Sequence, residues 1–132
     1  MENLSNEIWK DIIEYKGLYQ ISNYGRVKAL EKIVITEMCS YLRKEKILKP
    51  RKNRDGYMYI NLRIFKNPKS YMVHRLVANA FLPKIRNKNI VNHIDFIKHN
   101  NIANNLEWCN QKENVRHSIP NMIKTKRLKH FR

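Results

Sequence analysis

The sequence has 132 residues, of which 27 are Lys or Arg and 11 are Asp or Glu, so its formal net charge is +16. This excess of positive charge is typical of a protein that binds a polyanion, either nucleic acid or an anionic membrane surface. Hydrophobic residues make up 42% of the chain, which is enough for a buried core and excludes wholesale disorder. The length predicts one domain, with at most a loosely attached segment.

The sequence lacks the features that are typical of membrane proteins, secreted proteins and proteins with a structural zinc site. It has no run of about 18 apolar residues, so we expect no membrane partner, and its first residues, MENLSNEIWK, do not resemble a signal peptide. Cys39 and Cys109 stand far apart without a Cys-x-x-Cys motif, which argues against structural zinc and a disulfide framework. We therefore expect a protein of a reduced, intracellular compartment, the cytoplasm.

The N-terminal part predicts a β-hairpin. Residues 18–22 and 26–30 form the expected strands, and Asn23-Tyr24-Gly25 supplies the turn, in which Gly25 can adopt a positive φ. Residues 32–38 fit either a third strand or an irregular excursion. Residues 41–54 are the most basic stretch, and they fit either a loop or edge strand that grips phosphates or a solvated surface segment. The candidates for phosphate contact are Arg43, Lys44, Lys49, Arg51, Lys52 and Arg54.

Residues 57–65, YMYINLRIF, alternate in polarity and predict a strand with one face in the core. The core face would carry Met58, Ile60, Leu62 and Ile64. The opposite face would carry Tyr57, Tyr59, Asn61 and Arg63. Of these, Tyr57, Tyr59 and Arg63 are candidates for contact with a DNA groove, although the pattern fits an ordinary amphipathic strand equally well.

The middle and C-terminal parts predict three further strands and two helices. Pro68 indicates a turn at 66–70, followed by a short strand at 71–73 and a helix that begins near His74 and ends at Pro83. His74 fits a capping or packing role or, alternatively, a direct catalytic one. A strand at 90–94, a polar loop at 95–103 and a strand at 105–109 precede a helix that Asn110 and Glu113 would cap. The basic tail, 119–132, is either frayed or a short helix on DNA.

The segment 90–118 contains residue types that phosphodiester hydrolysis requires. A neutral imidazole such as that of His93 can take a proton from water, and a divalent cation on oxygen ligands can stabilise the phosphate and the leaving oxygen. An amide oxygen that accepts from the far ring nitrogen would fix the tautomer of the imidazole. His93 and Asn105 can face each other across a hairpin. Spacing alone leaves two interpretations open, a nuclease centre and an Asn-rich surface hairpin with one incidental His.

A resemblance to a known family distinguishes between these interpretations. The segments VNHID, HNN, NNLEW and QKENVRHS resemble, in order and spacing, the HNH nucleases found among phage and intron-encoded homing endonucleases. The preceding VHRLVANAFLP resembles the segment that leads into this motif. The N-terminal EIWKDIIEYKGLYQISNYGRVKAL is similar to the NUMOD4 type of nuclease-associated module.

The resemblance implies an α+β fold, in which a β-rich N-terminal segment precedes an HNH ββα-metal finger. It divides the chain into a NUMOD4-like hairpin and basic loop at 1–56, an HNH domain at 57–118 with its lead-in strand and helix, and a basic tail at 119–132. We expect the protein to act as a monomer, with a dimer left open. Phe96 stands where the family often has glycine, so a positive φ at this position would be strained.

The resemblance also implies the roles of the site residues. His93 would be the general base, Asn105 would orient it, and His117 would lie near the metal or the scissile phosphate. Asn92 and Asn114 would bind one divalent cation, Mg²⁺ with Mn²⁺ also accepted. The expected activity is hydrolysis of double-stranded DNA, as a nickase or a double-strand cutter. The alternatives are a catalytically decayed HNH-fold DNA-binding protein and a basic RNA-binding protein.

Overall fold

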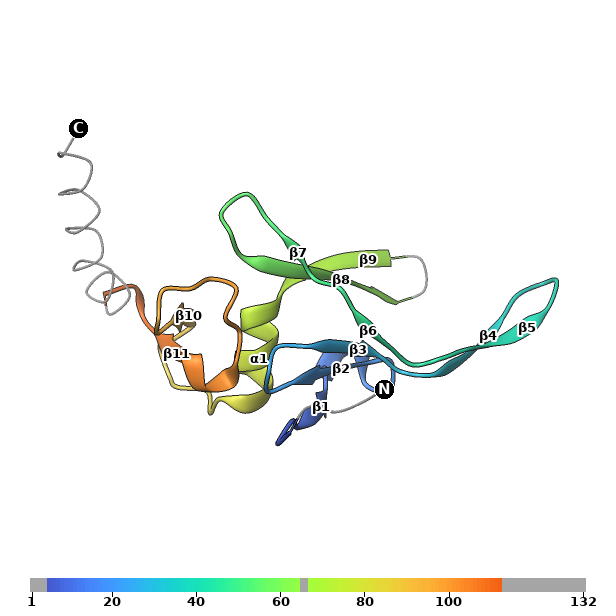
Figure 1. The fold of residues 1–132 in the computed structure, drawn as a ribbon, viewed down its shortest axis with the longest axis horizontal. Coiled ribbons are helices and arrows are strands. Elements are labelled where there is room, and N and C mark those ends of the chain that lie inside the picture. Colours follow the sequence, from blue (N-terminus) through green and yellow to red (C-terminus); the bar gives the residue numbers. More distant parts are fainter. Residues whose placement is uncertain (1–4, 65–66, 113–132) are drawn as a thin grey trace.

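The computed structural model describes residues 5–64 and 67–112. Within these ranges the chain is rich in strands and carries one α-helix of nine residues, α1 (Val73–Phe81), which confirms the predicted α+β class (Figure 1). No helix in the described ranges has the length and apolar character needed to cross a membrane. The helix predicted from Asn110 lies mostly beyond Lys112, so Asn114, His117 and the tail fall outside the described residues.

An antiparallel sheet forms the N-terminal part of the fold. Its strands are β1 (Trp9–Asp11), β2 (Tyr19–Ser22), β3 (Val27–Ala29) and β6 (Lys46–Leu48), in that order, with the 3-10 helix η1 (Ile13–Tyr15) between β1 and β2. The β2–β3 pair confirms the predicted hairpin, and Gly25 in its turn has a φ of +84°. The sheet buries Ile21 and Val27 almost completely, which anchors the hairpin in the core.

A second hairpin projects away from the body of the fold (Figure 1). It consists of β4 (Lys32–Ile35) and β5 (Ser40–Arg43), which pair only with each other. This settles the open alternative for residues 32–38, since the first half of that segment is a strand. Its apolar side chains are largely exposed, and Ile33 and Ile35 are 65% and 80% accessible.

A three-stranded sheet carries the predicted amphipathic strand at its centre. The strands are β7 (Arg51–Lys52), β8 (Met58–Ile64) and β9 (Asn67–Met72), in that order. Ile60 and Leu62 are buried while Asn61 and Arg63 are exposed, as the alternation predicted. The predicted turn at 66–70 is wrong, because β9 already begins at Asn67. Pro68 is tolerated there because β9 is an edge strand and Pro needs no partner on its open side.

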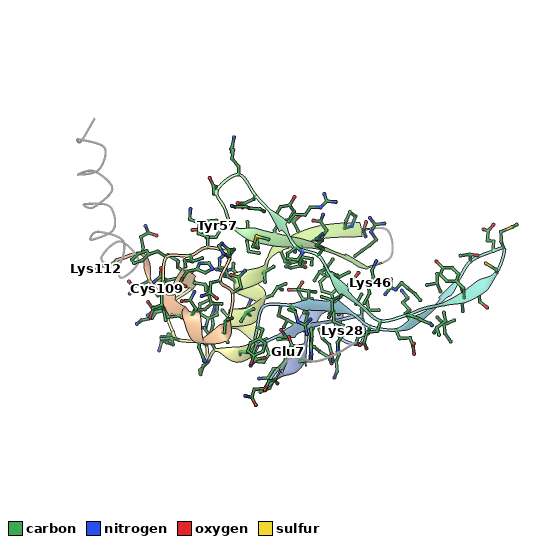
Figure 2. All side chains as sticks on the ribbon, in the orientation of Figure 1. Glu7, Lys28, Lys46, Tyr57, Cys109 and Lys112 are labelled. Carbon is green, nitrogen blue, oxygen red and sulfur yellow. The ribbon has the colours of Figure 1, made fainter. Side chains whose placement is uncertain are left out.

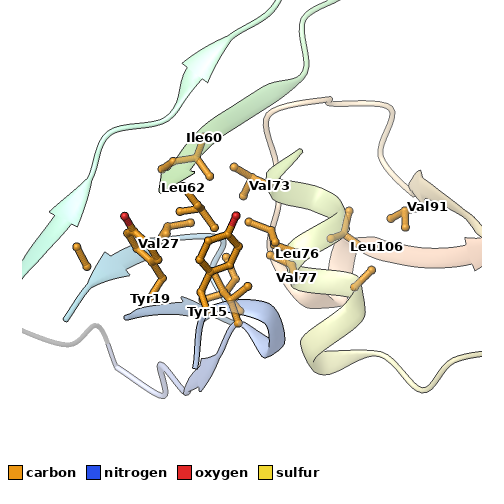
Figure 3. Close-up of a cluster of buried hydrophobic side chains, with 14 of the residues drawn as sticks. Tyr15, Tyr19, Val27, Ile60, Leu62, Val73, Leu76, Val77, Val91 and Leu106 are labelled. Carbon is orange, nitrogen blue, oxygen red and sulfur yellow. The ribbon is translucent and has the colours of Figure 1, made fainter. Parts of the chain in front are cut away.

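Helix α1 joins the N-terminal sheet, the three-stranded sheet and the β10–β11 hairpin into one core. It packs against β2, β8 and β9 on one side and against the hairpin of β10 (Ile90–His93) and β11 (Leu106–Cys109) on the other (Figure 3). Val77 and Ala78 are fully buried, and burial of an aliphatic side chain of the size of Val77 contributes roughly 1.5–3 kcal/mol. A short 3-10 helix, η2 (Ala103–Asn105), leads into β11. The helix predicted to begin near His74 and end at Pro83 is confirmed as α1.

The predicted boundary between residues 56 and 57 is crossed by hydrogen-bonded strands. Arg51 and Lys52 of β7 pair with Tyr59 and Met58 of β8. The division of the chain into domains therefore stays a prediction, and the two parts share one core.

Candidate active site

His93 lies at the end of β10 and is buried, with 5% of its surface exposed. Side chains alternate along β10, so Val91 and His93 point into the core and Asn92 points to the opposite side. The Nε2 atom of His93 lies 2.8 Å from Oδ1 of Asn101, which is itself buried. An amide oxygen only accepts hydrogen bonds, so Nε2 carries the proton in this arrangement. The lone pair of a neutral His93 is then on Nδ1, where it can accept a proton.

Two further rings surround His93. The ring of His74, on the first turn of α1, lies 5.0 Å from the His93 ring between centroids, and the ring of Tyr57 lies 5.2 Å from His74 and 5.9 Å from His93. Figure 2 shows Tyr57 at the end of β8 that faces the β10–β11 hairpin. Tyr57 was predicted as a DNA contact, and the structure places it beside the candidate base.

The sequence left open whether His74 has a capping, packing or catalytic role. It is 8% exposed, and its Nδ1 is buried without a hydrogen-bond partner in the described part of the chain. Burial lowers the pKa of His74 to about 4, with smaller contributions from His93 and Arg75. His74, Val77 and Ala78 share the buried face of α1, and this helical spacing was the sequence signal for its inward position.

Asp95 organises the loop between the two strands of the hairpin. Its carboxylate accepts from the backbone N–H of Ile97 and from the side-chain amides of Asn100 and Asn105. The hydrogen bond from Asn100 is the largest of the effects that lower the pKa of Asp95. Phe96 has a φ of +64°, so the loop adopts a positive φ at this position despite the strain that it imposes on a residue with a side chain.

The structure assigns different partners to Asn105 from the one predicted. Its Nδ2 donates to Asp95 and to the carbonyl of Asn100, and its Oδ1 accepts from the backbone N–H of Asp95. Because both ends of its amide are used by the loop, the described contacts give the place beside His93 to Asn101 instead. The sequence analysis missed Asn101, although it noted the HNN segment that contains it. A role of Asn105 in orienting His93 through this loop stays a prediction.

Asn92 and Glu107 provide oxygen atoms on the outer side of the hairpin. They are paired across β10 and β11, and Asn92 Nδ2 donates to Glu107 Oε1 at 3.0 Å. The amide oxygen of Asn92 therefore stays available to a cation. Glu107 also places a carboxylate beside Asn92, whereas the two predicted ligands, Asn92 and Asn114, carry no formal charge. Oxygen donors of this kind suit Mg²⁺. In the described ranges no group of three or more His, Cys, Asp and Glu side chains could hold a metal, and the other predicted ligand, Asn114, lies outside them.

The predicted DNA-binding side chains lie mainly on the three-stranded sheet and the strands that lead to it. Arg51 pairs with Tyr59 across β7 and β8, so both side chains share a face of the sheet with Arg63. Arg51, Lys52 and Arg54 are exposed, whereas Arg43 on the projecting hairpin is half-buried. Lys44 and Lys49 are exposed next to β5 and β6. The candidates on the sheet and those on the projecting hairpin therefore occupy separate regions.

Comparison with known proteins identifies two family segments in this chain. Residues 7–63 match the NUMOD4 motif, and residues 71–116 match the HNH endonuclease family. A solved structure describing DNA binding and cleavage by the HNH homing endonuclease I-HmuI superposes with a TM-score of 0.69 at 32% identity, covering 93% of this chain and 68% of that one. The chain belongs to the HNH endonuclease family.

The similar members of this family are longer than the present chain. I-HmuI of Bacillus phage SP01 is 37% identical over 111 residues, which are 84% of this chain and 57% of that enzyme. An HNH endonuclease of Acanthamoeba polyphaga mimivirus is 38% identical in an alignment of 133 positions that covers 93% of this chain and 29% of the relative. HNH endonucleases generally use a divalent metal ion.

Proposed function

We propose that this chain is a metal-dependent DNA endonuclease that hydrolyses phosphodiester bonds of double-stranded DNA, with His93 as the general base. The observation that carries the proposal is the hydrogen bond from His93 Nε2 to Asn101 Oδ1. It holds the imidazole in the tautomer whose Nδ1 can take a proton from an attacking water. Membership of the HNH family and the likeness to I-HmuI, which binds and cleaves DNA, support the same activity.

The surroundings of His93 suit a general base. The buried ring of His74 and the half-buried ring of Tyr57 limit access of bulk water to one side of the imidazole and restrict its rotation. Asp95 fixes the loop that begins two residues after His93, through its bonds to Ile97, Asn100 and Asn105. The base is thus held from the helix side and from the loop side before substrate arrives, which reduces the reorganisation needed for reaction.

Mg²⁺ is the cation that the oxygen donors would accommodate, with Mn²⁺ as a substitute. Asn92 and Asn114 would hold it, with Glu107 keeping the amide of Asn92 in position. When bound, the ion would supply charge stabilisation to the phosphate and to the leaving oxygen. The half-buried Asn92 and the exposed Glu107 lie where a phosphate can reach them, so substrate oxygens can complete the coordination.

DNA would lie along the basic surface of the three-stranded sheet. Arg51 and Arg63 are exposed on one face of this sheet and Arg54 is exposed in the turn after β7, and the net charge of +16 favours the approach of a polyanion. Tyr57 links this surface to the site, since its ring contacts His74 and His93 and lies 4.8 Å from Lys98 Nζ. A strand of DNA on the sheet would thereby lead towards the candidate base.

The test is conversion of supercoiled plasmid to open-circular or linear DNA, with Mg²⁺, Mn²⁺ or EDTA, for wild type and His93→Ala. We expect metal-dependent cleavage that the variant loses by a factor of about 10²–10⁴, the usual contribution of a general base. The product shows whether one strand or both are cut. Salt-sensitive DNA binding without cleavage in either metal would refute the proposal in favour of a DNA-binding protein of the same fold.

A further inference from the structure

We propose that the turn of the N-terminal hairpin positions His93 through Asn101, so that the NUMOD4 segment is a working part of the active site. The module turn is defined here as residues 22–26, between β2 and β3. This inference rests on the proposed function, in which His93 is the general base. It assigns the module a task besides DNA contact, because the turn touches the residue that holds the base.

The first contact is made by Gly25. Its φ of +84° is supported by a hydrogen bond from its N–H to the carbonyl of Ser22, and the buried Ser22 hydroxyl accepts from the N–H groups of Tyr24 and Arg26. A Cβ atom at Gly25 would lie 2.9 Å from Cβ of Asn101 and 3.0 Å from its carbonyl oxygen. The module turn therefore lies directly against the backbone and the Cβ of Asn101, at a distance that only glycine allows.

The second contact lies two residues further along the same loop. The N–H of Ala103 donates to the carbonyl of Asn23 at 2.8 Å. Asn23 is fixed in turn, because its N–H donates to the carbonyl of Ile8 and its Oδ1 accepts from the N–H of Ile8. The two contacts bracket the segment 101–103 and hold it against the N-terminal sheet.

These contacts set the position of the oxygen that His93 uses. Asn101 is 6% exposed, and its Oδ1 lies 2.8 Å from His93 Nε2. A side chain at Gly25 would have to push Asn101 away by roughly 0.5 Å to restore ordinary van der Waals contact. A comparable lengthening would take the bond to His93 beyond the usual range of about 2.7–3.2 Å. The base would then lose its fixed tautomer and orientation.

The experiment compares Gly25→Ala with Gly17→Ala. Gly17 has nearly the same φ, +82°, but nothing lies within 4 Å of the position of its Cβ. Both variants carry similar backbone strain, and only Gly25→Ala displaces Asn101. The measurements are single-turnover plasmid nicking at saturating protein, DNA affinity by fluorescence anisotropy, and the ¹⁵N NMR shifts of the His93 ring, which report its tautomer.

We expect Gly25→Ala to nick about 10- to 100-fold more slowly, as misplacement of a catalytic group typically does, with the dissociation constant for DNA within about twofold of wild type. The His93 ring of this variant should populate both neutral tautomers. Gly17→Ala should keep the wild-type rate and a ring protonated at Nε2. Equal rates for wild type and Gly25→Ala, or equal losses in both glycine variants, would overturn the inference.

A second variant keeps the inference testable if Gly25→Ala does not fold. Ala103→Pro removes the N–H that donates to Asn23, and the first residue of η2 is a position where proline is tolerated. Ile102 before it is already extended, at φ −68° and ψ 135°, as a residue before proline must be. A slower rate with a mixed His93 tautomer supports the positioning role, and an unchanged rate and tautomer refute it. Wild type without nicking in any metal would refute the proposed function instead, and the NMR comparison would still decide the positioning.

Discussion

Acidification is expected to destabilise the fold through His74. Burial of His74 in the core and, to a smaller extent, the neighbouring His93 and Arg75 lower the pKa of His74 from 6.5 to about 4. Between these values the unfolded chain binds a proton that the folded chain does not, so the free energy of unfolding falls as pH decreases. The stabilising contribution is complete above pH 6.5 and is lost as pH falls towards 4.

The size of this effect follows from the difference between the two pKa values. One pKa unit corresponds to about 1.4 kcal/mol, so a shift from 6.5 to about 4 is equivalent to about 3 kcal/mol. The steepest loss should be about 1.4 kcal/mol per pH unit, within that window. Since small domains are stable by about 5–15 kcal/mol in total, this loss is a large fraction of the stability.

The assay is urea denaturation at several pH values between 7.5 and 4, for wild type and His74→Phe. Phenylalanine keeps a ring beside His93 and Tyr57 but cannot bind a proton. The other titrating groups contribute to the curves of both proteins, so the difference between the two curves reports the titration of His74. We expect wild type to lose about 3 kcal/mol more than the variant over this range. Parallel curves for the two proteins would show that His74 is not buried in its neutral form, and the reasoning would be refuted.

Three further predictions concern the site and the DNA surface. Asn101→Leu removes the acceptor for His93 Nε2 and should slow single-turnover nicking about 10- to 100-fold. Asn101→Asp keeps an oxygen at this place and should retain most of the nicking rate. Equal losses in the two variants would contradict the role of Asn101 in fixing the tautomer of His93. Phe96→Gly relieves the backbone strain of a φ of +64°. After the entropy cost of glycine is subtracted, the free energy of unfolding in urea denaturation should rise by about 0.5–1 kcal/mol. A less stable variant would show that contacts of the Phe96 ring outweigh the strain. The double variant Arg51→Ala, Arg63→Ala removes two cations from one face of the sheet. It should reduce the slope of log affinity for DNA against log salt by about 2, measured by anisotropy, and an unchanged slope would place the DNA elsewhere.

Local patterns in the sequence determined the elements and their inward faces. The alternation in 57–65 predicted which side of β8 is buried, and Ile60 and Leu62 confirm it. Turn chemistry also indicated that Gly25 could adopt the positive φ that it has in the turn between β2 and β3. These features depend on steric limits of a few adjacent residues, so a short stretch of sequence suffices to specify them.

Tertiary structure decided which side chains meet at the site. Four asparagines lie between residues 100 and 105, and each amide offers the same donor and acceptor groups, so spacing could not tell which of them reaches His93. The path of the loop decides it, because Asp95 occupies the amide of Asn105 while Gly25, about 75 residues earlier in the chain, leaves room for Asn101. The approach of His74 to His93 depends in the same way on how α1 packs against β10. Contacts of this kind arise only when distant segments share one core. For that reason the sequence alone indicated His93 as a candidate base but did not indicate which residues surround it.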